Sequence, residues 1–300
     1  MSYLFARLLA CCLAAFSWLL LSATLSLAHE KKTIIWGIVD EFPVWITSGA
    51  NKGMGIMDVR LRLLMAELSD YNHRQISMSL PRVVEELKGD SRFCFMGILK
   101  TPIRETFMHF SPAALLAQPT SLVTTKSNLE KLAPYRDEAG KLDLKALLQN
   151  ETFSLFVMQD RSYSPSLDTM LRDLRHEENE NLRLHRGMPR FNLRAKQLLA
   201  GRLSGLLGSP LEIYNIALSS GEEHELSLLP IQNEPNETVA YVGCSKNGIT
   251  HKTMSDISSA VLKLRSTADF VTPSLTWSPN VFRKDYEKLA RRALADDFPD

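Results

Sequence analysis

One arginine follows an apolar, strand-like segment in this 300-residue chain and is a candidate for binding a carboxylate. The segment covers residues 93–99, Arg104 comes shortly after it, and the tripeptide Phe-Ser-Pro closes the stretch at residues 110–112. A guanidinium placed beyond the end of a buried strand can donate two parallel hydrogen bonds to a single carboxylate. The alternative is a solvated surface arginine that pairs with Glu105 or another nearby acid.

The sequence contains no pattern typical of a catalytic or metal site. Its histidines lack the spacing of metal ligands, no serine stands in a G-x-S-x-G turn, and no G-x-x-x-x-G-K-[ST] phosphate loop occurs. His109 precedes the Phe-Ser-Pro tripeptide, where it could assist chemistry, but we interpret it as structural. The sequence therefore favours a binding protein over an enzyme and indicates neither a cofactor nor a metal.

The first 28 residues have the features of an export signal. Arg7 is the only charged residue before His29, residues 8–27 are almost wholly apolar, and small residues occupy the cleavage positions of Ser26-Leu27-Ala28. We predict a signal peptide over residues 1–28. The alternative is an uncleaved anchor, because about 20 apolar residues can span a bilayer.

Charge and cysteine content limit the classes of partner and the compartment. Removing Arg7 with the signal lowers the 35 basic residues by one, which matches the 34 acidic residues. A balanced chain offers no electrostatic argument for a nucleic-acid partner or an anionic membrane surface. Cys94 and Cys244 remain in apolar, strand-like runs, and in an oxidising compartment they form either a disulfide or two separate buried thiols.

The elements that must position these residues alternate between strand and helix. Apolar runs predict strands at residues 33–39, 75–80 and 93–99, with amphipathic helices between them. This βαβαβ order implies a largely parallel sheet with right-handed crossovers. The rest of the chain repeats the alternation, with strands at 153–158, 203–207 and 238–244 and helices at 142–148, 167–174, 193–200, 255–265 and 285–293.

The order of these elements and motifs resembles that of the bacterial extracellular solute-binding proteins of family 3, the periplasmic receptors of polar amino acid ABC importers. The similarity covers nearly all of residues 33–280, and within the family it is strongest with a divergent branch that shares the two cysteines. The matching residues, in chain order, are Asp40, Phe42, Pro43, Gly53, Asp58, Gly97, Thr101, Arg104, Phe110-Ser111-Pro112, Ala200-Gly201-Arg202 and residues 241–246.

The resemblance implies a periplasmic-binding-protein type 2 fold, with two α/β lobes joined by two crossing strands and a ligand held between them by hinge closure. Lobe one would comprise residues 29–120 and 243–300, and lobe two residues 121–242. Each lobe would contain a mostly parallel sheet. The strand that returns to lobe one would lie beside its third strand, which favours a Cys94–Cys244 disulfide.

The resemblance also implies a set of ligand-binding residues, all located at strand ends or helix starts facing the cleft. They are Asp40, Phe42, Trp45, Gly97, Leu99, Arg104, Ser162 and Ser209. Leu99 and Ser209 occupy positions where relatives place residues that hold the ammonium group of the ligand. We therefore expect a ligand with an anionic group and no free ammonium, or a peptide-like or aromatic compound. Ser162 precedes a helix, and for residues 162–166 helix capping by Ser164 or Ser166 is the competing interpretation.

These implications lead to one functional prediction. The mature protein would be a periplasmic, monomeric, non-enzymatic binding protein that captures a small anionic or amino-acid-like molecule for an ABC importer. Two alternatives remain: a sensory or accessory module that signals to a membrane receptor, and an enzyme built on the same fold.

Overall fold

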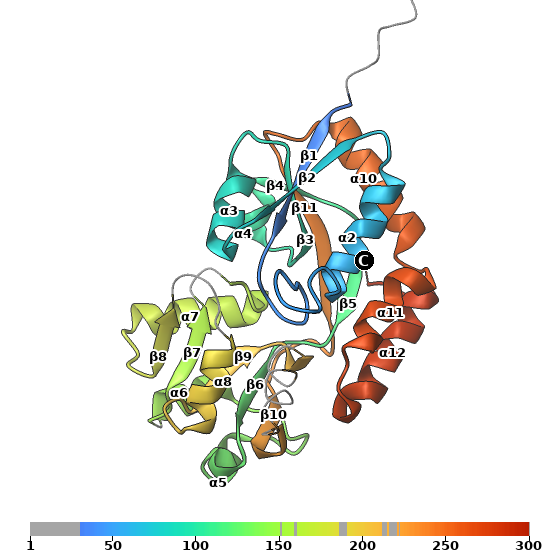
Figure 1. The fold of residues 1–300 in the computed structure, drawn as a ribbon. Coiled ribbons are helices and arrows are strands. Elements are labelled where there is room, and N and C mark those ends of the chain that lie inside the picture. The colour runs from blue at the N-terminus through green and yellow to red at the C-terminus, as the bar shows by residue number, and fades with distance from the viewer. Residues whose placement is uncertain are drawn as a thin grey trace, which may run out of the picture.

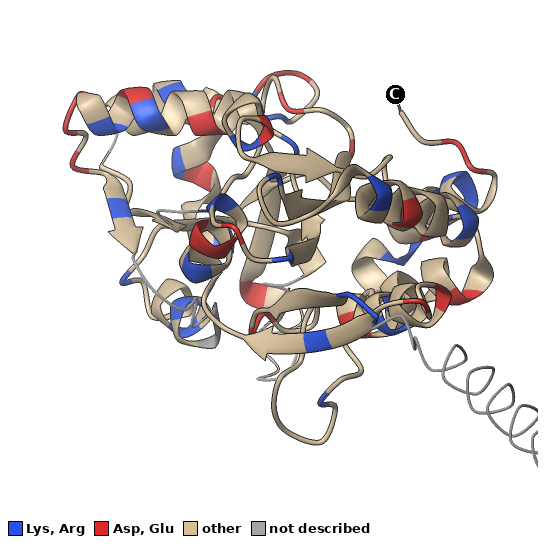
Figure 2. Cartoon of the chain, turned by 90° about the horizontal axis from the view of Figure 1, so that it is seen from above, with Lys and Arg blue, Asp and Glu red and all other residues tan. Residues whose placement is uncertain are grey.

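Two β-sheets, each flanked by helices, make up the computed structural model of the protein (Figure 1). The structure describes residues 31–150, 152–158, 161–185, 191–211, 215, 221 and 223–299, so the predicted signal peptide lies outside the described residues. Within these ranges, no helix combines the length and the apolar character that crossing a membrane would need. Acidic and basic residues are interspersed along the helices around both sheets (Figure 2).

The first sheet has the strand order β2-β1-β3-β11-β4, and β5 pairs with β11 beyond this path. Its strands are β1 (Thr33–Ile38), β2 (Asn72–Ser77), β3 (Phe93–Ile98), β4 (Met108–Phe110), β5 (Leu115–Ala117) and β11 (Thr238–Ser245). Helices α3 (Leu80–Lys88) and α4 (Pro102–Glu105) lie on one side of this sheet, and the others lie on the opposite side (Figure 1): α2 (Ile56–Glu67), α10 (His251–Leu264), α11 (Ala268–Thr276) and α12 (Arg283–Leu294).

The second sheet has the order β10-β6-β9-β7-β8. Its strands are β6 (Ser121–Thr125), β7 (Leu155–Met158), β8 (Leu182–His185), β9 (Gly205–Gly208) and β10 (Leu226–Pro230). The helices associated with it are α5 (Leu129–Leu132), α6 (Leu144–Asn150), α7 (Pro165–His176) and α8 (Phe191–Leu199).

The two-sheet α/β architecture confirms the predicted fold class, but both sheets are mixed rather than largely parallel. β1 pairs in parallel with β2 and β3, and β7 pairs in parallel with β8 and β9. Every pairing of β11 is antiparallel, as are the pairings of β6 with β9 and β10. β6 and β10, which run antiparallel to each other, are the strands by which the chain enters and leaves the second sheet.

Each sheet has its own hydrophobic core. The first core contains fully buried residues of β1, β3, α2 and α10, among them Trp36, Leu64, Phe93 and Ile257. The second is built from leucine-rich segments of β6, β7, β9 and α7. Because each core buries its own apolar surface, each sheet and its helices can hold together as a unit.

The chain passes between the two sheets twice. Residues 118–120 connect β5 to β6, and residues 231–237 connect β10 to β11. β11 begins at Thr238 and pairs with β5, so residues 238–242 belong to the first sheet, although the sequence prediction placed them in lobe two.

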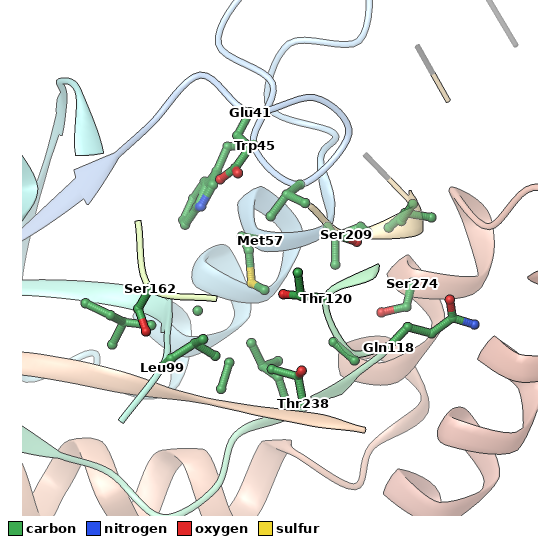
Figure 3. Close-up of a pocket in the computed structure, with 18 of the residues that line it drawn as sticks. Glu41, Trp45, Met57, Leu99, Gln118, Thr120, Ser162, Ser209, Thr238 and Ser274 are labelled. Carbon is green, nitrogen blue, oxygen red and sulfur yellow. The ribbon is translucent and has the colours of Figure 1, made fainter. Parts of the chain in front are cut away.

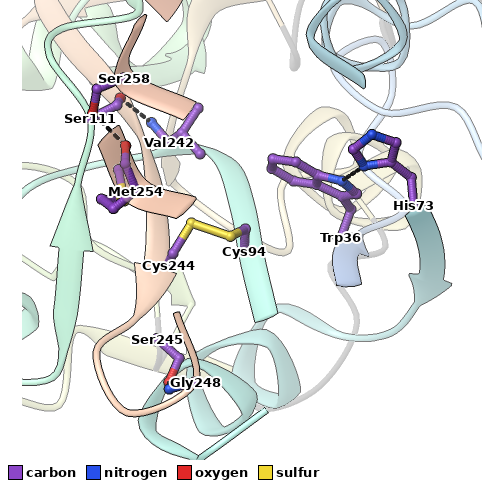
Figure 4. The surroundings of a disulfide bond; sticks show 10 residues. All are labelled: Trp36, His73, Cys94, Ser111, Val242, Cys244, Ser245, Gly248, Met254 and Ser258. Carbon is purple, nitrogen blue, oxygen red and sulfur yellow. Dashed lines mark hydrogen bonds between the residues drawn. A yellow bond between two sulfur atoms is a disulfide. The ribbon is translucent and has the colours of Figure 1, made fainter. Parts of the chain in front are cut away.

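A disulfide joins Cys94 in β3 to Cys244 in β11, which confirms the predicted bond and excludes two separate thiols (Figure 4). The two residues lie directly opposite each other in the antiparallel pairing, with a Cα–Cα distance of 4.1 Å. Both are fully buried. Beside β3, the Trp36 Nε1 donates a hydrogen bond to the Nδ1 of His73 at 3.1 Å.

Candidate functional site

A cavity of about 170 Å³ lies between the two sheets and is lined by residues from both (Figure 3). The first sheet and its helices contribute Trp45, Met57 and Leu99, and the second contributes Ser162 and Ser209. Gln118 and Thr120, from one of the two connections, complete the wall together with Thr238 at the start of β11. The cavity therefore lies where both parts of the molecule can contact one ligand.

Arg104 lines this cavity and is 8% exposed. It belongs to the short helix α4, whose first residue is Pro102, and the Thr101 hydroxyl accepts a hydrogen bond from the Arg104 backbone N–H at 3.3 Å. The guanidinium Nη1 donates to the Leu99 carbonyl oxygen at 2.9 Å. Burial lowers the pKa of Arg104 to about 10, and the charge of Asp168 opposes this shift.

The alternative pairing of Arg104 with Glu105 does not occur in the structure. Glu105 instead forms an exposed ion pair with Lys100 at 3.1 Å. The Arg104 side chain points to the cavity and the Leu99 carbonyl, which leaves its remaining N–H groups available to an anion.

Gly97 and Leu99 also line the cavity. Gly97 has a φ of 91°, which favours glycine, and a Cβ at this position would lie 3.1 Å from the Cε of Met57. A side chain here would be strained and would press on Met57. Leu99 contributes its side chain to the wall and its carbonyl to Arg104.

Of the three predicted residues after β1, only Trp45 reaches the cavity. Trp45 is 1% exposed and packs against Phe95 with ring centroids 6.0 Å apart. Asp40 is exposed and accepts a hydrogen bond from the Thr47 hydroxyl at 2.7 Å. Phe42 packs edge-on against Trp277, with ring centroids 5.3 Å apart.

The separation of these residues has a local cause. Glu41 and Trp45 form an antiparallel bridge, with backbone N–H to carbonyl distances of 3.1 and 2.8 Å. The bridge closes a tight turn over residues 42–44. Glu41 and Trp45 at its two ends line the cavity together with Val44, whereas Asp40 and Phe42 do not.

Ser162 and Ser209 line the cavity on the side of the second sheet. The Ser162 hydroxyl donates to Asp168 Oδ2 at 2.5 Å, and the Tyr163 backbone N–H donates to Asp168 Oδ1 at 2.9 Å. Helix capping falls to Ser164, whose hydroxyl accepts from the Leu167 backbone N–H at 3.0 Å. Ser162 therefore lies at the cavity wall, while the cap of α7 is made by a neighbour.

The structure adds an ion pair that the sequence analysis missed. Arg161 Nη1 donates to Glu41 Oε1, and both residues line the cavity. The pair joins the loop after β1 to the segment before α7, so it links the two sides of the cavity. The partners are 120 residues apart in the chain, and no local pattern marks them.

A second arginine, Arg60, was also missed. It lies in α2, is 5% exposed and lines the same cavity. Its Nε donates to the Phe270 carbonyl at 2.6 Å and its Nη2 to the Ser274 hydroxyl at 2.8 Å. Burial lowers its pKa to about 9. Its position four residues after Ile56 and four before Leu64, on the apolar face of the helix, was the available signal.

The electrostatic character of the lining is positive. Its charged members among the described residues are three arginines, Arg60, Arg104 and Arg161, and one glutamate, Glu41. The described part of the chain contains no cluster of three or more side chains suited to a metal ion. The arrangement favours a small anion held by hydrogen bonds and charge.

Comparisons with known proteins identify the fold. No protein-family model matches the chain, and no curated protein matches its sequence. Solved structures do match over most of their length. A structure from work on glutathione import through GshT and the cystine ABC importer of Streptococcus mutans has a TM-score of 0.63 at 13% identity, covering 85% of this chain and 99% of that one. The chain has the periplasmic-binding-protein fold.

Two further matching structures come from a transport protein and from a signalling protein. A Listeria monocytogenes structure described as an L-cystine ABC transporter has a TM-score of 0.60 at 16% identity, covering 82% of this chain and 95% of that one. A histidine kinase sensor domain with similarity to periplasmic binding proteins has a TM-score of 0.60 at 13% identity, covering 83% and 96%. The fold is thus shared by proteins of transport and of signalling.

Proposed function

We propose that this protein is a solute-binding protein that captures a small anionic molecule and delivers it to an ABC importer. The observation that carries the proposal is the Arg104 guanidinium, buried at 8% exposure and lining a cavity between two sheets. Among the described residues, no carboxylate forms an ion pair with it, and its one direct partner is a neutral carbonyl. Asp168 acts on it through charge without a direct contact, so a bound carboxylate or similar anion would supply the direct anionic partner.

The residues that line the cavity argue against an ordinary α-amino acid as the ligand, because its ammonium group would need an acidic partner. Glu41 is the one acidic residue among the described lining residues, and it is already paired with Arg161. Leu99 and Ser209, at the positions discussed above, carry no charge. Desolvating an ammonium without a carboxylate partner is costly, so a ligand without that group fits better.

Hinge closure is the binding mechanism we propose. The lobes would be those predicted from the resemblance to family 3, residues 29–120 with 243–300 and residues 121–242, except that residues 238–242 of β11 pair within the first sheet. The two connections would act as the hinge. The Glu41–Arg161 ion pair, whose side chains are 14% and 17% exposed, would join the lobes in the closed state. A ligand that contacts both sides would shift the population toward that state.

The proposed location is the periplasm, reached through the signal peptide of residues 1–28, and the mature protein would be a monomer that needs no cofactor and performs no catalysis. The Cys94–Cys244 disulfide is consistent with an oxidising compartment. Membership of a divergent branch of family 3 is part of the same proposal. The match to a histidine kinase sensor domain supports the second candidate, a binding module that reports to a membrane sensor.

A thermal-shift screen of residues 29–300 tests the proposal. The panel would contain small carboxylates, free amino acids and short peptides, each at several concentrations. A ligand that binds only the folded state at 100 times its Kd stabilises it by about 2.7 kcal/mol. We expect carboxylates without an ammonium group to raise the Tm, and chromatography to recover them unchanged. A panel in which no anion raises the Tm would contradict the proposal, and conversion of the ligand would indicate an enzyme.

A further inference from the structure

Two buried arginines line the cavity, and the residues that accept their hydrogen bonds lie on different sides of it. Arg104 donates to the carbonyl of Leu99, whereas Arg60 donates to the hydroxyl of Ser274. Figure 3 places Leu99 and Ser162 on one side of the pocket and Ser274 and Gln118 on the other. The two charges are therefore held by different elements, α4 and α2, around one cavity.

Arg60 has neutral partners only. Besides the contacts to Phe270 and Ser274, its Nη2 lies 3.5 Å from the Val271 carbonyl, and its guanidinium carbon lies 5.5 Å from the centroid of the Phe270 ring. Among the described residues, no carboxylate forms an ion pair with it. These contacts tie α2 to α11, but they leave a charge with 5% exposure uncompensated. Burying an unpaired charge is costly, and a bound anion would relieve that cost.

The rest of the lining fits a spacer between two charged ends. The lining also includes apolar side chains, among them Met57, Leu115 and Ala240. The cavity volume of about 170 Å³ leaves room for a short molecule. Three arginines against one glutamate give the lining an excess of two positive charges.

We propose that Arg60 forms a second anion subsite, so that the ligand is a small dianion with its two anionic groups separated by a short apolar chain, as in an α,ω-dicarboxylate. This inference rests on the proposed function and assigns the substrate class of the same cavity. Arg104 binds one carboxylate and Arg60 the other.

Calorimetry with matched probes tests the subsite. The probes are straight-chain dicarboxylates from succinate to pimelate, each compared with the monocarboxylate of equal carbon number. In the wild-type protein we expect at least one dicarboxylate to bind ten or more times tighter than its monocarboxylate. Arg60→Gln should reduce that ratio to about one. Arg62→Gln, which changes an exposed arginine of the same helix, should preserve the ratio.

Arg60 also forms hydrogen bonds to α11, so its replacement can prevent folding. A measurement on the wild-type protein tests the subsite in that case. The Arg60 Nε–H resonance in an arginine ¹H–¹⁵N spectrum should shift when the dicarboxylate is added and stay in place with the monocarboxylate. Equal affinities for both probes, or a ratio unchanged by Arg60→Gln, would overturn the subsite while leaving the Arg104 proposal standing. Binding of no carboxylate at all would overturn both.

Discussion

Removing the Cys94–Cys244 disulfide should destabilise the protein strongly without altering the cavity. The bond joins residues 150 positions apart, and the whole of the second sheet lies within that loop. On the chain-entropy model, closing a loop of this length stabilises the folded state by about 5 kcal/mol, within the range of about 2 to 5 kcal/mol typical of native disulfides. Since proteins are stable by about 5 to 15 kcal/mol, this is a large share.

The variant should be Cys94→Ala/Cys244→Ala, because both positions are fully buried and a serine hydroxyl would lack a partner there. Urea unfolding followed by circular dichroism measures the free energy of unfolding and its m-value. We expect a loss of about 3 to 5 kcal/mol and a larger m-value, since the unfolded chain without the cross-link exposes more surface.

The control is the wild-type protein unfolded in urea with and without dithiothreitol. Without reductant, thiol titration of the unfolded chain should detect no free cysteine, and with reductant the unfolding curve should approach that of the double variant. A loss below about 1 kcal/mol with an unchanged m-value would refute the reasoning, because the bond would then not constrain the unfolded chain.

Three further predictions concern single residues. Gly97→Ala should lower the free energy of unfolding by about 1 to 3 kcal/mol in urea titrations, because of the positive φ and the contact with Met57; an unchanged value would contradict this. Carboxylate affinity measured by calorimetry should fall as pH rises through about 10, since burial lowers the pKa of Arg104 to about 10 and binding favours its charged form; constant affinity through this range would contradict the lowered pKa. Stability should fall as pH drops below 6.5, because burial lowers the pKa of His73 and the unfolded state then binds more protons. In His73→Asn, which keeps an acceptor for Trp36, the fall should be shallower.

The sequence predicted those strands and helices that have a clear local pattern of apolar residues. The apolar run at β3 and the spacing of the buried leucines in α2 were sufficient for those elements. Strands β6 and β10 were not predicted, because they are five residues long and mix serine or threonine with leucine and valine. Missing them hid the antiparallel pairs of the second sheet. The Cys94–Cys244 pairing depends on the register of distant strands, so only the resemblance indicated it.

In the candidate site too, residues of a local motif could be predicted, whereas residues with distant partners could not. Gly97 and Arg104 were predicted because they belong to one short motif. The contacts of Arg60 with α11 span 210 residues of chain, and such partners cannot be read from spacing. Asp40 and Phe42 follow the same strand as Trp45, but the bridge between Glu41 and Trp45 selects which side chains face inward, and that depends on backbone hydrogen bonds.

The most direct test of the account is the affinity of the Arg104→Ala variant for the carboxylate that most stabilises the wild-type protein. A charge-assisted contact of this kind is worth about 1.5 to 3 kcal/mol, which corresponds to about a tenfold to hundredfold change in Kd. We expect calorimetry to show a loss of at least that size while circular dichroism shows a folded protein. Arg82→Ala, which removes an exposed arginine of α3, should bind as the wild type does. Unchanged affinity in a folded Arg104→Ala variant would contradict the central claim.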